Sequence, residues 1–490
     1  MTHLGIQIPV RNIPEFDAGF VPMALFCREY LNQAEKPLSI AIERNDGLTA
    51  VYDTFVTGRN VEADRYYVER TVKTLLWVKG GYKVYICGDV DIAAYIKDAY
   101  SGSGSRAFDK MMMERIYESG FEVISLPLSC KPAEKEQAMP IGGNLKGCRI
   151  GFDAGGSDRK VSAVIDGEAV YSEEVVWHPK TNPDPDYHYR EIVAAFKTAA
   201  SKMPRVDSIG VSSAGVYISN RTMAASLFIK VPEELFNSKV KDIYIRAARE
   251  IGDVPLNVVN DGDVTALAGA MELAGSDAPG EHFRGSAIEG QPHLNGSEMG
   301  EAALAPGTRC PALGLGNSVL GVAMGTSEAG GFVDANGNIT GWLNELAFAP
   351  VDANPLAMAD EWSGDIGCGV KYFSQDGVIK LAAAAGMELP ADMTPGEKLK
   401  AVQDGGDPRA AGIFRSIGCY LGHTLPYYHE FYRFRHVLVL GRVMSGTGGN
   451  LIAEAAKAVL SEEYPDCKID ICVPDENNRR IGQSIAAASL

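Results

Sequence analysis

Residues 258–270 of the chain read VVNDGDVTALAGA, and this stretch decides the fold. The apolar run from Pro255 to Val259 predicts a buried strand, and a helix rich in small residues is predicted to follow at once. Asn260 and Asp261 therefore stand where a strand becomes a helix. In open α/β sheets, ligands and catalytic side chains collect at the carboxyl ends of strands. Asp261 is equally a favoured helix N-cap residue, so this segment alone supports capping and a functional role about equally.

The composition narrows the class of protein. The chain has 490 residues, enough for two or three domains, with 46% hydrophobic and 22% charged residues, as in ordinary globular proteins. Its formal net charge of -17 argues against a nucleic-acid partner and against an anionic membrane surface. We find no apolar run that could span a bilayer and no signal peptide pattern. The cysteines are scattered and form no CxxC pair, which predicts reduced thiols and a cytoplasmic location.

Residues 1–145 are predicted to form an N-terminal α/β domain, to which the sequence assigns no role. Periodicity predicts strands at 38–42, 82–87 and 121–126, and helices at 63–77, 90–100 and 107–119. The segment 131–146 is polar, contains Pro and Gly, and is interpreted as a linker. No helix-turn-helix pattern and no basic helix occur in this domain.

Residues 146–270 begin with a predicted hairpin whose first turn carries groups suited to phosphate. Strands are predicted at 148–152, near 161–165 and at 169–176. Gly155 and Gly156 would let backbone N–H groups approach a phosphate closely, while Ser157 and Lys160 could add donors. Asp153 could hold a magnesium ion through water, because Mg²⁺ keeps several waters and takes few carboxylates. A plain hairpin turn is the alternative, since Asp and Gly are common turn residues.

The remaining elements continue the α/β pattern. Residues 271–490 contain an insertion at about 275–316, interpreted as a functional flap or a partly disordered segment. A second strand–turn–strand unit follows, whose turn begins with Gly325 and Thr326. A later strand ends in Gly441, which fits a nucleotide-base shelf and an ordinary α/β turn equally well. The other predicted elements are strands at 206–213, 318–324 and 436–440 and helices at 186–203, 239–251, 378–385, 409–428 and 450–460.

Together these motifs resemble the ROK family of sugar kinases and sugar-responsive repressors, within the actin-like ATPase superfamily. The similarity covers roughly residues 148–490. The residues from Asp153 to Ser157 resemble the family's first phosphate motif, and Asn260-Asp261 resembles its N-D motif. The stretch from Gly325 to Gly331 resembles the second phosphate motif, 341–345 the G-x-x-G-E stretch, and 439–441 the adenosine-side strand and turn.

The resemblance implies an α/β fold of two actin-like (ribonuclease-H-like) halves around a cleft, after the additional N-terminal domain. It also implies a carbohydrate kinase that uses ATP and Mg²⁺ to phosphorylate a hydroxyl of a sugar or polyol. Asp261 would be the general base. The resemblance further implies substrate-binding residues (Asn260, Glu345 and Gly215), nucleotide- or phosphate-binding residues (Asp153, Gly155, Gly156, Ser157, Lys160, Gly325, Thr326 and Gly441), Asp153 as the Mg²⁺ residue, and a homodimer, as in many relatives.

The chain departs from the family at its zinc motif. The aligned stretch is 361–368, where only Cys368 remains as a potential thiolate ligand, and Phe348 stands at the position of the upstream histidine. A closed structural zinc site needs four nitrogen or sulfur ligands, so no zinc is expected. Cys368 is then expected to be a small buried hydrophobe.

Two further departures bear on the substrate and on catalysis. Val370 stands where the family places a sugar-binding glutamate, and an apolar residue cannot pair with a hydroxyl. Either another residue takes over, with Glu328, Asp365 and Lys371 as candidates, or the acceptor is a cyclitol, ketose or modified sugar. In the second turn Ser327-Glu328 replaces a glycine and an apolar residue, and a carboxylate beside phosphates is expected to repel them. A non-catalytic sugar-sensing or sugar-binding protein is therefore the alternative function, followed by an ATPase that acts on itself or a partner.

Overall fold

The computed structural model describes residues 1–138, 142–276, 318–474 and 483–490. The chain divides into two compact units. Unit 1 comprises residues 1–137, 322–330 and 342–473, and unit 2 comprises residues 138–321, 331–341 and 474–490. The insertion predicted at about 275–316 falls almost wholly outside the described residues. The three-part domain division made from the sequence stays a prediction.

Unit 2 is built on a five-stranded mixed sheet in the order β13-β10-β7-β8-β9. Its strands are β7 (Cys148–Ala154), β8 (Asp158–Ile165), β9 (Glu168–Val176), β10 (Ser208–Ser213) and β13 (Leu256–Asn260). The first three pair antiparallel, and β10 and β13 extend the sheet parallel to β7. This mixed sheet with helices packed on it confirms the α/β class predicted from the sequence. The run at β7 is buried at every position because both faces of this central strand are covered.

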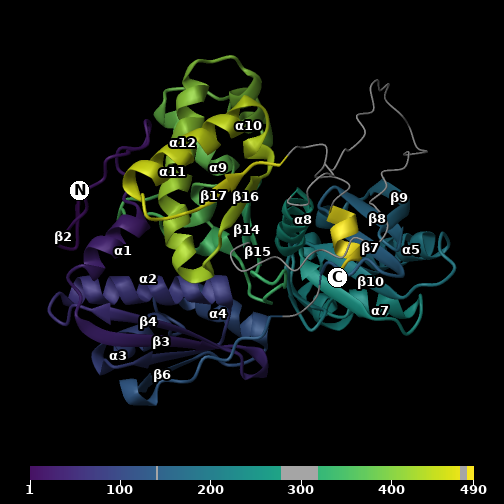
Figure 1. The fold of residues 1–490 in the computed structure, drawn as a ribbon, viewed down its shortest axis with the longest axis horizontal. Helices are drawn as coiled ribbons and strands as arrows, with labels where there is room; N and C mark the ends of the chain where they lie inside the picture. The colour runs from purple at the N-terminus through teal and green to yellow at the C-terminus, as the bar shows by residue number, and fades with distance from the viewer. Residues whose placement is uncertain (139–141, 277–317, 475–482) are drawn as a thin grey trace. The chain divides into compact units, whose positions relative to one another are not determined.

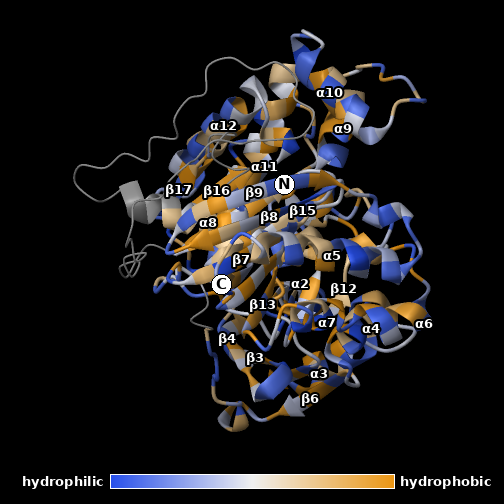
Figure 2. Cartoon of the chain, turned by 90° about the vertical axis from the view of Figure 1, so that its right-hand side faces the viewer, coloured by the Kyte–Doolittle hydropathy of each residue, from blue (hydrophilic) through white to orange (hydrophobic). Residues whose placement is uncertain are grey.

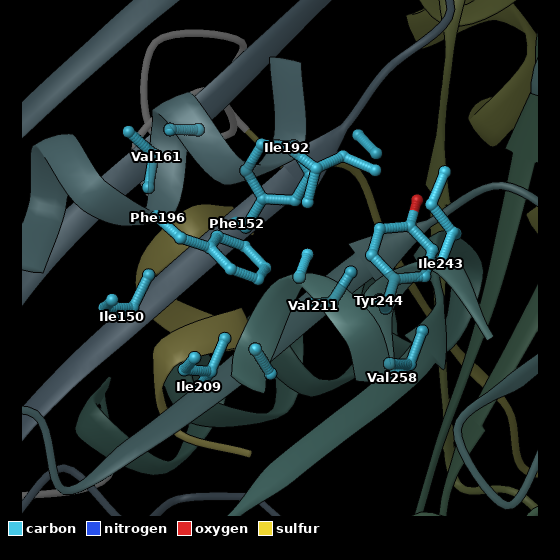
Figure 3. Close-up of a cluster of buried hydrophobic side chains, with 14 of the residues drawn as sticks. Ile150, Phe152, Val161, Ile192, Phe196, Ile209, Val211, Ile243, Tyr244 and Val258 are labelled. Atoms are coloured by element: carbon cyan, nitrogen blue, oxygen red, sulfur yellow. The ribbon is translucent and has the colours of Figure 1, made fainter. Parts of the chain in front are cut away.

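Helices α5 (Pro185–Ala200) and α7 (Ile243–Arg249) bury one face of this sheet (Figures 1 and 3). Phe152 of β7 meets Phe196 of α5 edge to face, with ring centroids 5.4 Å apart. On the opposite face Gly151 and Gly210 replace side chains, because the backbone of the helical residues 483–488 lies against them. Any Cβ at Gly210 would collide with the carbonyl oxygen of Ala487.

Helix α8 (Asp261–Ser276) follows β13 directly, as the sequence predicts. Its first turn is fixed by the end of strand β15 (Glu328–Val333). The Phe332 N–H donates to Asp263 Oδ1 at 2.9 Å, and a Cβ at Gly331 would collide with the carbonyl of Gly262. The glycine at 331 therefore permits a close approach that holds the start of α8, and with it Asp261, in place.

The N-terminal part of unit 1 contains a four-stranded sheet in the order β4-β3-β5-β6 (Figure 1). The three predicted strands and three predicted helices are confirmed, whereas β4 and α1 were not predicted. The elements are α1 (Met23–Leu31), β3 (Lys36–Glu43), β4 (Thr49–Val56), α2 (Val61–Lys79), β5 (Lys83–Cys87), α3 (Val90–Ala99), α4 (Ala107–Tyr117) and β6 (Glu122–Leu126).

The rest of the chain adds a second four-stranded sheet, β15-β14-β16-β17, and a set of helices. Two of them, α11 (Arg409–Tyr432) and α12 (Thr447–Glu463), pack closely because Gly418 and Gly422 leave room for the backbone of α12. Orange and blue mix along surface helices such as α10, as expected where one face is buried (Figure 2). The other elements of this part are β14 (Val319–Met324), α9 (Gln375–Ala384), α10 (Pro395–Asp404), β16 (His436–Leu440) and β17 (Asp470–Cys472).

Short elements complete the described chain. They are β1 (Thr2–His3), β2 (Ile6–Gln7), β11 (Val216–Ile218), β12 (Arg221–Ala224) and α6 (Glu233–Leu235). The aromatic residues near the end of α11, which the sequence left open as core or dimer face, are buried within the chain: Tyr427, Tyr428, Phe431, Tyr432 and Phe434. Within the described ranges, no helix combines the length and the apolar character that crossing a membrane requires.

Candidate active site

Three neighbouring parallel strands of unit 2 end at one edge of its sheet and bring polar residues together there. In the register, Asp153 of β7 lies opposite Ser212 of β10, and Ser213 lies opposite Asn260 of β13. Asp261 follows Asn260 as the first residue of α8. The edge at which the carboxyl ends of parallel strands meet is where α/β proteins place their ligands. The structure thus brings the predicted residues Asp153, Asn260 and Asp261 to one edge.

Asp153 is a buried carboxyl group with unbalanced negative charge nearby. It is 6% exposed, and its Oδ1 accepts a hydrogen bond from Ser212 Oγ at 2.9 Å. Burial raises the pKa of Asp153 to about 6, against the lowering effects of Lys160 and of the Ser212 hydrogen bond. The negative charge of Asp261 raises this pKa further. Ser212 had been left out of the site predicted from the sequence, although its place at the end of a strand could have indicated it.

Asn260 and Asp261 share the start of α8. Asn260 Oδ1 accepts from the Gly262 N–H at 2.7 Å, and Asp261 Oδ1 lies 3.1 Å from the same nitrogen. Asn260 therefore makes the stronger contact to the helix start, which leaves the carboxylate of Asp261 less committed. Burial raises the pKa of Asp261, while the Gly262 N–H and the charge of Lys180 lower it. Asn260 Nδ2 also donates to the Gly215 carbonyl at 2.7 Å, where glycine is required by a φ of +139°.

The first turn, residues 154–157, joins β7 to β8. Ser157 Oγ donates to Asp158 Oδ2 at 3.0 Å, and Lys160 pairs with Asp158 at 3.3 Å. The buried Trp177 contacts the turn, because its indole Nε1 donates to the Gly155 carbonyl at 2.8 Å. Lys180 lies against Gly156, which could not carry a larger side chain without displacing it. Trp177 and Lys180 thus lie at this turn, and no sequence motif had indicated either of them.

The second turn, residues 325–327, lies in unit 1. Thr326 and Ser327 are exposed, and the Gly325 carbonyl accepts from the N–H of Gln375 at 2.9 Å. Gly441 is brought beside this turn: it has a φ of +106°, and a Cβ there would collide with the carbonyl of Met324. Gly441 and Gly325-Thr326 therefore lie close together in unit 1, and their binding roles stay a prediction.

Glu328 corrects an expectation made from the sequence. Its carboxyl group does not stand among exposed groups of the second turn: it is 2% exposed and lies beneath Gly369. Oε1 accepts from Tyr428 Oη at 3.2 Å, and burial raises the pKa of Glu328 to about 8. The group is therefore mostly uncharged at pH 7. The expectation that Glu328 presents a carboxylate at the second turn is wrong, because the carboxyl is buried and its raised pKa favours the neutral form.

Glu345 is positioned by the N-terminal part of unit 1. Its backbone N–H donates to the carbonyl of Trp77 at 3.0 Å, and the N–H of Asn344 donates to that of Val78 at 3.1 Å. Helix α2 thereby anchors the G-x-x-G-E-like stretch at its own end. Phe348, at the position of the family's histidine, stacks on Trp77 with ring centroids 4.1 Å apart. Helix α2 of the N-terminal segment is therefore in direct contact with the stretch from Asn344 to Phe348.

The stretch aligned with the zinc motif is occupied by a buried charge network. Asp365 pairs with Arg70 at 3.0 Å, with Lys73 at 3.2 Å and with Arg106 at 2.7 Å. Burial would raise the pKa of Asp365, but Arg70 and Lys73 lower it overall. Cys368 is fully buried, as expected, and burial raises its pKa to about 12, so it is a thiol and not a thiolate. The absence of zinc stays a prediction. The structure shows that Arg70 and Lys73 of α2 pair with Asp365 within this stretch.

The candidates for replacing the lost sugar-binding glutamate are all engaged within the protein. Asp365 and Glu328 are held as described above, and Lys371 pairs with Glu361 and with Asp376, the latter at 2.8 Å. Among the described residues, no group of three or more His, Cys, Asp or Glu side chains could hold a metal ion. A magnesium ion held mainly by water needs only one or two carboxylates.

We compared the chain with protein families, curated proteins and solved structures, and only the solved structures gave matches. No protein-family model matches the chain, and no curated protein matches it. A ROK hexokinase from Thermus thermophilus is 16% identical with a TM-score of 0.49, over 70% of this chain and 97% of that one. A ROK family glucokinase from Streptomyces griseus, solved with glucose and AMPPNP, is 18% identical with a TM-score of 0.45, over 70% and 98%.

A third match is a ROK family transcriptional regulator, a homologue of the E. coli MLC protein. It is 16% identical with a TM-score of 0.46, over 71% of this chain and 79% of that one. All three structures are ROK family proteins, the family that the sequence motifs resemble.

Proposed function

We propose that the chain is an ATP- and Mg²⁺-dependent kinase that phosphorylates a hydroxyl group of a sugar or sugar-like molecule. The observation that carries this proposal is the pairing of Asp153 and Asp261 at the carboxyl edge of the sheet in unit 2. One carboxylate is buried at the end of a strand, and the other begins a helix made of small residues. Phosphoryl transfer needs mainly positioning and charge neutralisation, and carboxylates with glycine-rich turns are groups suited to both.

In the proposed reaction Asp261 accepts the proton of the acceptor hydroxyl as its oxygen attacks the γ-phosphorus of ATP. The bond from the γ-phosphorus to the bridging oxygen breaks, and ADP leaves. The raised pKa of Asp261 makes it a stronger base than an exposed aspartate. Asn260, Glu345 and Gly215 are proposed to bind the acceptor, and Gly155, Gly156, Ser157, Lys160, Gly325, Thr326 and Gly441 the nucleotide.

Asp153 fits a Mg²⁺ ion held through water. Its pKa is raised to about 6, which means that the protein leaves the negative charge there incompletely balanced. A divalent cation would relieve that imbalance and, when bound, would neutralise phosphate charge. Lys160 is paired with Asp158 and only partly offsets the charge of Asp153.

The alternative function is a sugar-binding protein without turnover, favoured by one observation. Phe348 and Val370 leave two positions without a polar group for a hydroxyl, and Phe348 is packed against Trp77. A buried hydroxyl without a partner is costly, so an ordinary aldohexose would bind weakly. An ATPase without a small-molecule acceptor is the third possibility and would release ADP from ATP alone.

The test is an ADP-release assay with ATP and Mg²⁺ across hexoses, amino sugars, ketoses and cyclitols. We expect turnover that requires one acceptor class and falls 10²- to 10⁴-fold in Asp261→Asn. Asp253→Asn, an exposed aspartate of the same unit, is the matched control and should keep full turnover. Full turnover in Asp261→Asn would refute the mechanism. Sugar binding without ADP release would favour the alternative.

A further inference from the structure

We propose that Lys180 is a phosphate-contacting catalytic residue, whose ammonium group binds the transferred phosphoryl group between the first turn and Asp261. This inference rests on the proposed kinase function and deepens it. Lys180 lies 24 positions from Gly156 in the sequence and belongs to no motif of the resemblance. Three observations in unit 2 support the proposal. They are the position of the Lys180 ammonium group, the hydrogen bonds that hold the segment carrying Lys180, and the charge of Lys180.

The first feature is the place of the ammonium group. Lys180 Nζ lies 3.0 Å, and Cε 2.9 Å, from the point that a Cβ on Gly156 would occupy. Gly156 thus gives the lysine room to lie directly against the turn whose backbone is proposed to bind phosphate. A lysine ammonium is a compact charge with three donors, which suits it to bind a phosphate oxygen.

The second feature is the support of the segment that carries Lys180. Just after β9, the Trp177 N–H donates to the Ser157 carbonyl at 3.1 Å, and its indole donates to that of Gly155 at 2.8 Å. Both bonds tie residue 177 to the first turn. Trp177 itself is 1% exposed, so the donor side of this attachment is held within the core of unit 2.

A buried histidine holds the other side of the segment. His188 of α5 is fully buried, with Nε2 3.0 Å from the Pro179 carbonyl and Nδ1 2.9 Å from the Asp184 carbonyl. Pro179 restricts the backbone just before Lys180. The backbone around Lys180 is therefore held on both sides, and Lys180 itself is exposed. Such support suits a residue that must present one charge at one place.

The third feature is charge. Lys180 lowers the pKa of Asp261, so its positive charge acts on the proposed base as well as on the turn. Across the parts of unit 2 that the structure describes, no carboxylate forms a salt bridge with Lys180, whereas Lys160 is paired with Asp158. A phosphoryl group that approaches Asp153 and Asp261 meets two negative charges. Lys180 therefore supplies a positive charge that no salt bridge within the described part of unit 2 neutralises.

The test separates binding of the transferred phosphate from binding of the rest of the nucleotide. The affinities of AMPPNP and ADP are measured by calorimetry with Mg²⁺, for the wild type, Lys180→Met and Lys180→Arg. We expect Lys180→Met to weaken AMPPNP about tenfold more than ADP, and to lower turnover about 100-fold, with partial rescue by Lys180→Arg. Lys230→Met, an exposed lysine of the same unit, should change neither.

Equal weakening of both nucleotides, or no weakening, would overturn the role of Lys180. The binding ratio does not depend on an acceptor, so it reports on Lys180 even if no acceptor is found and the proposed kinase function fails. Trp177→Phe removes the indole donor and tests the support. It should lower the AMPPNP-to-ADP affinity ratio in the wild type but leave it unchanged when added to Lys180→Met. An additive loss would mean that Trp177 acts independently of Lys180, and that the hydrogen bonds of Trp177 do not position the lysine.

Discussion

The two glycine-rich turns resemble each other in sequence and differ in where their charges lie. Around the first turn the charged residues Asp153, Asp158, Lys160 and Lys180 lie at or near the turn itself. Beside the second turn, the adjacent carboxyl of Glu328 is buried, and only the hydroxyl residues Thr326 and Ser327 are exposed. The comparison shows that charged side chains gather around the first turn, whereas the second turn exposes two hydroxyl residues.

The largest expected effect is at the first turn. Asp153→Asn removes the charge proposed to hold Mg²⁺ through water while keeping a similar shape, and turnover should fall about 10²- to 10³-fold, roughly 3 to 4 kcal/mol in activation free energy. The assay is acceptor-dependent ADP release at saturating Mg²⁺. Asp158→Asn, which changes the partner of Lys160 and Ser157 and a minor influence on the pKa of Asp153, is the control and should cost far less. Wild-type turnover in Asp153→Asn would remove Asp153 from the site.

The next effect concerns the buried carboxyl at the second turn. The pKa of Glu328 is about 8 in the folded chain and about 4.5 in the unfolded chain, so the folded state holds a proton that the unfolded state releases between these values. Stability should therefore fall as the pH rises from 4.5 to 8. The full difference would correspond to about 5 kcal/mol, and we expect about 2 to 3 kcal/mol after local relaxation.

Glu328→Gln removes this titration. Its gain in thermal stability over the wild type should grow between pH 5 and pH 8, measured by calorimetry at matched ionic strength. Glu388→Gln, at an exposed glutamate, should show no such trend. A pH-independent difference would mean that Glu328 is already ionised in the folded chain, and the contrast between the two turns would be lost.

A third prediction is the acid limb of the activity profile. Asp153 has a pKa of about 6, raised by burial, and its charged form is the one proposed to act. At subsaturating Mg²⁺, where the proton competes with the cation, turnover should therefore be lost as the pH falls through about 6, by up to about tenfold per pH unit. Asp153→Asn should lack this limb while keeping its low residual rate. A wild-type limb near the ordinary aspartate value of about 4 would contradict the raised pKa.

Some of these positions could be predicted from the sequence and others could not. The strand ends at Asp153, Asn260 and Gly441 were predictable because apolar runs that stop at polar or glycine residues mark the edge of a sheet. The direction of Glu328 was not, because which side of β15 faces the core depends on pairing with a strand of unknown register. Lys180 was not, because a contact between residues 156 and 180 leaves no local pattern.

The N-terminal segment gives a second example of that limit. Helix α2 buries Glu69, Arg70 and Lys73 along with its apolar residues, so its sequence resembles that of a solvated helix. The partner that makes this burial possible, Asp365, lies almost 300 residues away in the sequence. Three strands and three helices of residues 1–126 could therefore be predicted, whereas β4, α1 and the contacts of α2 with Glu345 and Phe348 could not.

A matched set of glycine substitutions compares the turns directly. A Cβ at Gly155 would lie 2.7 Å from the backbone oxygen of Asp158, one at Gly156 would meet only the flexible end of Lys180, and one at Gly325 would meet nothing closer than 3.8 Å. Gly155→Ala should therefore cost about 1 to 2 kcal/mol of stability, and the other two less than about 1 kcal/mol. Thermal unfolding measures this order. Equal losses at Gly155 and Gly325 would show that the turns are not distinguished in this way.

The smallest expected effect decides what the second turn contributes. Because Glu328 is buried and mostly protonated at pH 7, its charge should not act on a bound phosphate. Glu328→Gln should then change the affinity for Mg²⁺–AMPPNP by less than about twofold, under 0.4 kcal/mol, measured at pH 7 by calorimetry. A carboxylate beside the phosphates would behave otherwise, since removing it would tighten binding several-fold. Tighter binding in Glu328→Gln would mean that Glu328 is ionised and close to the bound phosphates. That result would favour the alternative function, a protein that binds ligands without turnover.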